Sequence, residues 1–319
     1  MLRILQNTSW DFIRQWKVAL GALVVFIVPA LLLIPLQGFR WSIEFTGGTQ
    51  IELVFKEAPV ISDVRAAVAT VGYGDAEIFN YGSPLDVVIR AQEAEQVAAL
   101  AAGAESVANR IEAAVAARYG ADAFMVNSTQ AVGPRVGSEL RRQSIVAMLI
   151  AFGLTLLYLA WRFEWRFGVA AVLATLHDII ATLAFIKYLD LEVSVFVVGA
   201  VLTVVGYSMN DKVVVFDRVR ENLRLHRKLS LYDLLNRSVN ETLPRTVMTG
   251  STTLACLLAL LIFGGAVIRP FAWVLIFGIV IGTFSSIFVA SPLLLWIERK
   301  YPRLTDAMPH ARGAAANKA

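Results

Sequence analysis

Cysteine is almost absent from this chain, which has only Cys256 among its 319 residues. A disulfide within the chain is therefore excluded, and a cysteine-based metal cluster is not expected. Charged residues are also scarce: they make up 17% of the chain, whereas hydrophobic residues make up 57%. Because soluble domains carry about 25% charged residues, this composition excludes an ordinary soluble protein. It predicts a chain that crosses a membrane several times.

The sequence also lacks the common motifs of enzymes and nucleotide-binding proteins. Gly47 and Gly48 do not form a phosphate-binding loop, because no Lys-Ser/Thr pair follows them and no helix is expected to begin there. Neither an HExxH zinc signature nor a nucleophile elbow occurs. We therefore expect no enzymatic activity, no cofactor and no metal. The net charge of +4 follows from the placement of the loops, so nucleic-acid binding is not expected.

Long apolar runs dominate the sequence instead. Six runs are long enough to cross a bilayer as helices; they cover approximately residues 18–36, 145–160, 168–186, 193–216, 247–263 and 271–297. An earlier start of the second run, near Glu139, is compatible with the pattern. Lys and Arg gather in the N-terminal tail, before the third run and in residues 217–245, whereas the opposite short loops contain only Lys187 and Arg269. Basic residues favour the cytoplasm, which places both termini there.

Residues 38–143 separate the first two runs and predict a domain on the outer, periplasmic side. Their pattern predicts strand 50–55, helix 62–71, strands 77–81 and 86–91, helix 93–119 and strand 124–130. The order βαββαβ is that of the ferredoxin-like fold. We therefore expect a mainly α membrane protein with six transmembrane helices and one periplasmic α+β domain.

The remaining domain boundaries follow from the same reading. Residues 1–37 are expected to form a cytoplasmic tail and the first transmembrane helix. Residues 144–298 are expected to form a five-helix bundle with a basic cytoplasmic loop at 217–245. Residues 299–319 are expected to be a disordered cytoplasmic tail.

Asp211 is the most informative single residue, because it lies inside the fourth apolar run. A charge in hydrocarbon costs at least about 2.5–3.5 kcal/mol, so such a residue favours a functional role. Arg245 begins the fifth run from the same side and is expected at a similar depth. A carboxylate that faces a guanidinium stays ionised, and it takes up a proton when that partner leaves. The alternatives are a static pair between two helices, or an Arg245 that extends to the membrane surface.

The neighbouring pair His177 and Asp178 lies near the middle of the third run. Asp178 is too deep to reach water and must face the bundle or a wet cavity. Two interpretations stay open, a proton relay or a polar packing contact to a Ser or Thr of a neighbouring helix. His177 is a candidate for such a relay, but it is also compatible with a hydrogen-bonded core residue. Gly278 and Gly282 form a GxxxG pattern, which predicts close helix packing or, alternatively, a sliding surface.

Four motifs together resemble the SecF family, the smaller half of the SecD–SecF accessory complex of bacterial protein secretion, which is similar to the RND transporter superfamily. The motifs are Glu44–Thr49, His177-Asp178, the stretch from Gly206 through Asp211 into 213–222, and Thr242–Thr246. The resemblance covers the chain from about Trp10 to Trp296. The sequence departs from the family pattern at Glu44, where Asp is usual, at Lys212, where Thr or Ser is common, and at Pro244, where Ser is common. Lys212 adjoins Asp211 and is expected to perturb that site.

This resemblance implies a function and partners. It implies a six-span subunit that pairs with SecD in the bacterial inner membrane and associates with the SecYEG channel, and with YajC and YidC. The complex would use the proton-motive force to assist late steps of preprotein translocation and release. Asp211 and Arg245 fall on the charged pair that the family uses in proton transport, with Asp178 as a further candidate. The supporting motif residues would be His177, Asn210, Gly206, Tyr207, Gly47 and Gly48.

Two other functions compete with this one. The first is a half-size RND-like, proton-coupled exporter of small molecules, which is disfavoured because an outer domain of about a hundred residues offers no obvious apolar drug pocket. The second is an intramembrane aspartyl protease in which Asp178 and Asp211 share a proton. The Tyr-Asp and Gly-x-Gly-Asp contexts of such proteases are missing.

Overall fold

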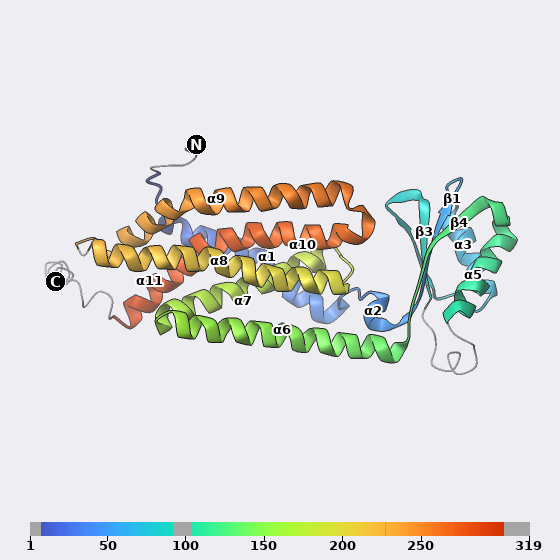
Figure 1. Cartoon of the computed structure of the whole chain (residues 1–319), viewed down its shortest axis with the longest axis horizontal. Coiled ribbons are helices and arrows are strands. Elements are labelled where there is room, and N and C mark those ends of the chain that lie inside the picture. Colours follow the sequence, from blue (N-terminus) through green and yellow to red (C-terminus); the bar gives the residue numbers. More distant parts are fainter. Residues whose placement is uncertain (1–7, 92–103, 227, 303–319) are drawn as a thin grey trace. The chain divides into compact units, whose positions relative to one another are not determined.

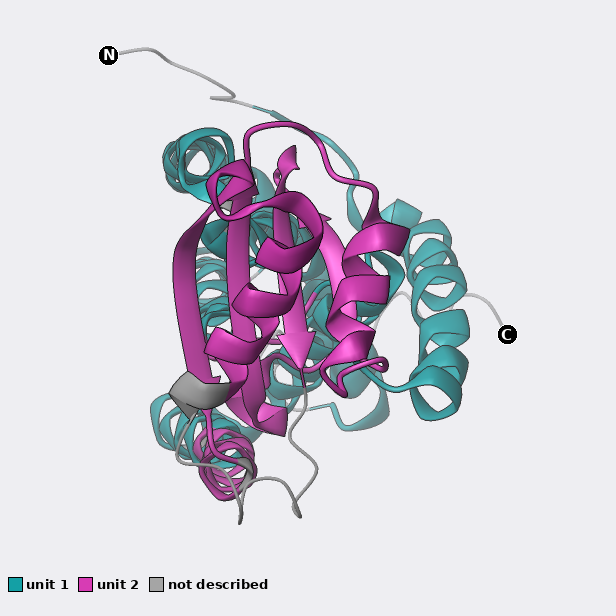
Figure 2. Ribbon diagram, turned by 90° about the vertical axis from the view of Figure 1, so that its right-hand side faces the viewer, with its two compact units in different colours: residues 1–39, 148–191, 196–319 teal, residues 40–147, 192–195 magenta. Residues whose placement is uncertain are grey.

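The computed structural model describes residues 8–91, 104–226 and 228–302, and the chain divides into two compact units (Figure 1). The helical unit contains residues 1–39, 148–191 and 196–319, and the α+β unit contains residues 40–147 and 192–195 (Figure 2). The expected class, a helical membrane protein with one small α+β domain, is confirmed.

Six helices among the described residues are long and apolar enough to cross a membrane, as predicted. They are α1 (Trp16–Gln37), α6 (Pro134–Arg162), α7 (Trp165–Tyr188), α8 (Val195–Leu225), α9 (Leu231–Phe263) and a composite helix of α10 (Gly265–Ser285), a π-helical turn (Ser286–Ala290) and α11 (Ser291–Lys300). The second helix begins before Glu139, at Pro134. A short 3-10 turn, Ile13–Gln15, precedes α1.

Most of residues 217–245, expected as a loop, lies in helices. α8 continues to Leu225, and α9 begins at Leu231. Ser230 caps α9, because its hydroxyl accepts a hydrogen bond from the backbone N–H of Asp233. Ion pairs one turn apart, such as Arg237 with Glu241 at 2.8 Å, support these helical ends. In the expected C-terminal tail, Arg299 and Lys300 end α11, and residues 303–319 lie outside the described part of the chain.

The interior of the helical unit is formed by α7, α8 and the composite helix. Within their most apolar windows, 50%, 56% and 67% of the residues are buried, whereas the share in α6 is 6%. α10 and α8 approach closely at Gly282, which has no side chain. A Cβ added there would lie only 2.9 Å from the Ser208 Cβ. Gly278 lies against Val204 in the same way. The GxxxG pattern is therefore a helix-packing contact in this structure.

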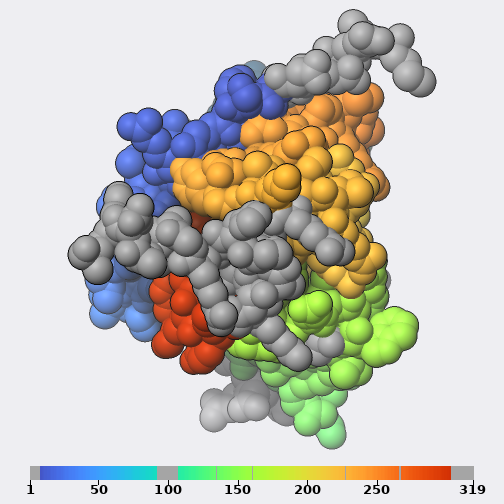
Figure 3. Space-filling model, turned by 90° about the vertical axis from the view of Figure 1, so that its left-hand side faces the viewer, coloured from blue at the N-terminus to red at the C-terminus, as the bar shows by residue number. Residues whose placement is uncertain are grey.

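The N-terminal segment is tied to the start of α9 (Figure 3). Asn240 accepts a hydrogen bond from the backbone N–H of Trp10 at 3.0 Å and donates to the Trp10 carbonyl at 2.8 Å. One turn earlier on α9, Asn236 accepts from the backbone N–H of Ile13 at 3.0 Å. Two side chains of one helix therefore fix the backbone that leads into α1.

The α+β unit has the predicted βαββαβ order. Its strands are β1 (Gly48–Phe55), β2 (Glu77–Tyr81), β3 (Ser83–Ala91) and β4 (Phe124–Val132), arranged as β2-β3-β1-β4 with antiparallel neighbours. The helices α3 (Ile61–Thr70) and α5 (Ala104–Tyr119) lie over one face of the sheet (Figure 2). Alternate residues of β1 point to them and form the core, including Ile51, Leu53 and Phe55. The first part of the predicted helix 93–119, up to residue 103, lies outside the described residues.

Candidate functional site in the helical unit

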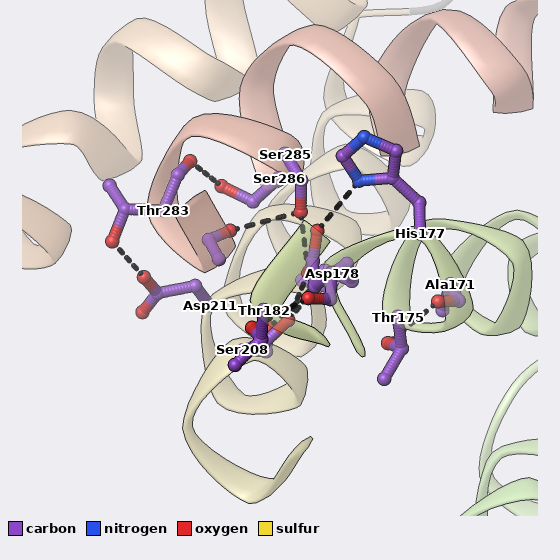
Figure 4. A network of polar contacts seen from close by, with 12 residues as sticks. Ala171, Thr175, His177, Asp178, Thr182, Ser208, Asp211, Thr283, Ser285 and Ser286 are labelled. Atoms are coloured by element: carbon purple, nitrogen blue, oxygen red, sulfur yellow. Dashed lines mark hydrogen bonds and ion pairs between the residues drawn. The ribbon is translucent and has the colours of Figure 1, made fainter. Parts of the chain in front are cut away.

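Asp178 lies at the centre of a buried polar network (Figure 4). Its side chain is fully buried, and its Oδ2 accepts hydrogen bonds from Ser208 at 2.5 Å, Lys212 at 2.6 Å and Ser285 at 2.7 Å. The His177 Nδ1 lies 3.0 Å from Oδ1, within donating distance. Helices α7, α8 and α10 thus all contribute a donor to one carboxylate.

Lys212 is turned toward Asp178 rather than toward its neighbour in sequence, Asp211. Its side chain is 0% exposed, and its ammonium donates to the Asp178 carboxylate, to the Ser208 hydroxyl and, at 3.4 Å, to the Ser208 carbonyl. Ser208 and Lys212 are four residues apart on α8 and share one face of that helix. Lys212 therefore forms a buried ion pair with the carboxylate of α7, a partner that the sequence did not indicate, and its charge also acts on Asp211 as expected.

Asp211 occupies the adjacent face of α8 and is 2% exposed. Its Oδ2 accepts a hydrogen bond from the Thr283 hydroxyl at 2.9 Å (Figure 4). Arg245 lies on an exposed face of α9, and within the described residues no ion pair joins it to Asp211. The two residues that the sequence predicts as a pair therefore form no ion pair in this structure, although the charge of Arg245 still acts on Asp211.

A polar groove of 630 Å³ runs between α8 and α9 beside Asp211. It is lined by Asn210, Val213, Val214, Asp217, Arg218, Glu221, Glu241, Thr242 and Arg245. Ion pairs mark its outer end, where Arg218 contacts Glu241 at 2.7 Å and Glu221 at 2.6 Å. The groove therefore brings Asn210 and Arg245, both singled out from the sequence, to one polar surface.

Of the other motif residues, Tyr207 and Gly206 lie on α8, whereas Gly47 and Gly48 form a backbone turn in the α+β unit. Tyr207 reaches α9, where its hydroxyl lies 3.9 Å from the position of a Cβ at Gly250, whereas Gly206 faces open space. Gly47 and Gly48, in the α+β unit, have φ angles of 76° and 124°, which other residues rarely adopt. A Cβ at Gly137 would lie 2.8 Å from the Gly47 nitrogen, so the glycines let the first turn of α6 approach this backbone.

The sequence reading missed a second buried ion pair at one end of the bundle. Arg166 at the start of α7 contacts Glu298 of α11 at 2.7 Å, and their side chains are 6% and 1% exposed. In the sequence, Arg166 precedes the third apolar run and was interpreted only as one of the basic loop residues that indicate the cytoplasmic side. A signal was present, because Glu298 ends an apolar run on the side where Arg166 begins one.

Six long apolar helices that enclose buried ionisable groups define a multi-pass membrane protein, and charged residues inside such a bundle are candidates for function. Within the described residues, no group of three or more His, Cys, Asp and Glu side chains is placed to hold a metal ion. The family model described as "Protein export membrane protein SecD/SecF, C-terminal" matches residues 112–300, and the SecD/SecF GG motif matches residues 32–59. The chain belongs to the SecD/SecF family.

Related proteins and structures agree with this assignment. Protein translocase subunit SecF of Gemmatimonas aurantiaca is 52% identical over 100% of this chain and 96% of its own length. The SecF subunit of Vibrio alginolyticus is 40% identical, with 98% of each chain covered. The crystal structure of SecDF, a translocon-associated membrane protein from Thermus thermophilus, matches with a TM-score of 0.81 at 36% identity. That match covers 94% of this chain, which spans 40% of the longer SecDF chain.

Proposed function

We propose that this chain is the SecF-type subunit of a SecD–SecF complex in a bacterial inner membrane. The complex would use the proton-motive force to assist late steps of preprotein translocation and release. The similarity to SecF subunits over the whole chain supports the assignment. SecD is the proposed direct partner, because the similar SecDF structure carries a region like this chain within 40% of its length. SecYEG, YajC and YidC are proposed as further partners, with both termini cytoplasmic and the α+β unit periplasmic.

Asp211 is the observation that carries the proton-driven part of this proposal. A carboxyl that is 2% exposed among apolar helices is stable in water-free surroundings when it holds a proton. It becomes a carboxylate when a cation approaches, and Arg245 on the neighbouring α9 is positioned to supply that cation in another conformation. The groove that contains Asn210 and Arg245 gives protons a polar route from the ends of α8 and α9.

The membrane potential can power such a cycle. One charge that crosses a potential of 100 mV releases about 2.3 kcal/mol. One or two protons per cycle therefore suffice for a conformational change of several kcal/mol. The change proposed here is the approach of Arg245 to Asp211 after proton release and its withdrawal after proton uptake.

Asp211→Asn tests this proposal in the assembled complex. We expect a proton flux in proteoliposomes at least about tenfold lower, and accumulation of preproteins in cells, because the amide cannot exchange a proton. Asp63→Asn is the matched control: it makes the same chemical change in the α+β unit, at an exposed ion pair with Arg118. Normal flux and normal export in Asp211→Asn would refute the proposal. Normal export combined with loss of small-molecule resistance would favour the exporter instead.

A further inference from the structure

We propose that Asp178 and Lys212 form a permanent ion pair, in which the Lys212 ammonium takes the place that a proton would otherwise occupy on Asp178. Asp178 then anchors α7 to α8 and α10, and proton exchange is left to Asp211. Lys212 is a positioning residue in this scheme. The role of Asp211 in this inference rests on the proposed function. The ion pair itself rests on the distance of 2.6 Å between the Lys212 ammonium and the Asp178 carboxylate.

Hydrogen-bond donors surround both oxygens of the Asp178 carboxylate. A carboxylate offers about four lone-pair sites to donors. Three donors, from Ser208, Lys212 and Ser285, approach Oδ2 within 2.7 Å, and His177 approaches Oδ1 at 3.0 Å. Oδ2 is therefore fully occupied, and a proton could bind only at Oδ1, where it would cancel the charge that holds the Lys212 ammonium.

The Lys212 ammonium is equally saturated. An ammonium has three N–H donors, and those of Lys212 reach the Asp178 carboxylate, the Ser208 hydroxyl and the Ser208 carbonyl. Both side chains of the pair are 0% exposed. A buried charge without its partner is strongly unfavourable, so neither group can leave without a large loss of stability.

The charged groups around Asp178 belong to two helices. His177 lies on its own helix α7, and Lys212 and Asp211 lie on α8, whereas α10 faces it with the hydroxyl of Ser285. His177 is the one group through which a proton could reach Asp178 from outside the network. Its Nε2 is buried without a hydrogen-bond partner in the described structure, beside an apolar pocket that includes Leu173 and Phe288.

α10 connects the anchored carboxylate with the exchanging one. Ser285 donates to Asp178, and Thr283, two residues earlier, donates to Asp211 (Figure 4). The π-helical turn begins directly after Ser285, and such turns are frequent at functional sites. The ion pair therefore fixes α10 at Ser285 and presents Thr283 to Asp211.

Removing the charges of Lys212 and Asp178, first one at a time and then together, tests this proposal. In the complete complex with its partner subunit, Lys212→Met leaves the Asp178 charge buried and unpaired, and we expect the thermal midpoint to fall by roughly 5–15 °C. Asp178→Asn leaves the ammonium unpaired and should also lower it. The double variant Asp178→Asn/Lys212→Met removes both charges and should regain most of the lost midpoint. It should also keep a proton flux within about threefold of the wild type, whereas Asp211→Asn keeps its midpoint and loses flux.

Three outcomes would overturn the permanent pair. A stable double variant without proton flux would show that proton exchange needs the Asp178–Lys212 pair and is not left to Asp211 alone. A Lys212→Met variant with an unchanged midpoint would show that the ammonium does not balance the carboxylate. A double variant as unstable as Lys212→Met would show that the two charges do not compensate each other. Normal flux in Asp211→Asn would refute the proposed function instead, and the midpoint comparison would still decide on the ion pair.

Discussion

Asp178 and Asp211 are two carboxylates in the same bundle, and both are buried, but their surroundings differ in kind. Asp178 receives donors from four side chains, one of them the ammonium of Lys212. Asp211 accepts a hydrogen bond from the Thr283 hydroxyl, and its other hydrogen-bonding neighbour, Asn210, is also neutral. Both lie on helices whose apolar runs look alike in sequence, so burial in a membrane helix does not by itself determine what a carboxylate does.

The difference shows which property allows proton exchange. A carboxylate that is neutralised by a permanent ammonium gains little from a proton, because binding one would leave the buried ammonium unpaired. A carboxylate whose hydrogen-bond donors are neutral has no permanent countercharge, so its ionised form depends on a cation that comes and goes. The three predictions that follow test this distinction between anchor and exchange site, beginning with the largest expected effect.

The pair Arg166–Glu298 provides a second anchor against which the Asp178–Lys212 pair can be calibrated. Arg166→Met leaves Glu298 buried and unpaired, so we expect a loss of about 3–5 kcal/mol in the free energy of unfolding. Arg162→Met is the matched control, because its partner Asp217 is 41% exposed, and exposed pairs contribute about 0–1 kcal/mol. Denaturant titration of both purified variants measures the difference. Equal losses would mean that burial does not distinguish anchor pairs from surface pairs in this bundle.

Much of the fold could be predicted from the sequence, because its signals are local. Six apolar runs predicted the membrane helices. Alternating apolar and polar residues, bounded by turn residues, predicted the strands of the βαββαβ order. The ends of α8 and α9 were missed, since hydrophobicity stops at the membrane boundary whereas a helix continues where ion pairs and a cap support it. Arg237 with Glu241 and the Ser230 cap are the local causes.

The partners of the buried charges could not be predicted in the same way. Sequence places Asp178, Asp211 and Lys212 at their depths in the membrane, but pairing depends on how α8 is rotated against α7 and α10. Adjacent residues on a helix point about 100° apart, so Asp211 and Lys212 face different neighbours. The four-residue spacing of Ser208 and Lys212 was the available signal that these two share a face.

Gly282→Ala should disturb the anchor without removing any charge. The added Cβ would lie 2.9 Å from the Ser208 Cβ and would push α10 away from α8. Overpacking of this kind costs about 1–3 kcal/mol, and it would lengthen the contact between Ser285 and Asp178. Gly206→Ala, on α8 and facing open space, is the control; it should be neutral or gain up to about 1 kcal/mol. Thermal unfolding of the two variants makes the comparison, and a Gly282→Ala protein as stable as Gly206→Ala would show that the helices can separate freely here.

Asp11 extends the comparison to a carboxylate outside the membrane, where the smallest effect is expected. The Tyr232 hydroxyl donates to its Oδ1 at 2.6 Å and Asn236 donates at 2.7 Å, and these hydrogen bonds lower the pKa of Asp11 below its usual value of 3.8. Because the folded pKa is the lower one, the stabilisation is present above the unfolded pKa and is lost as the pH falls through the folded pKa.

Tyr232→Phe removes the main donor and should return the pKa of Asp11 toward 3.8. The variant should therefore be slightly less stable than the wild type at neutral pH, and the difference should shrink below about pH 4. Thermal midpoints recorded from pH 7 to pH 3 test this, with Tyr188→Phe as a control, because its hydroxyl donates to the uncharged Phe26 carbonyl at 2.6 Å. A loss that is the same at every pH would mean that Tyr232 contributes through packing. The hydrogen bond from Tyr232 would then not account for the lowered pKa of Asp11.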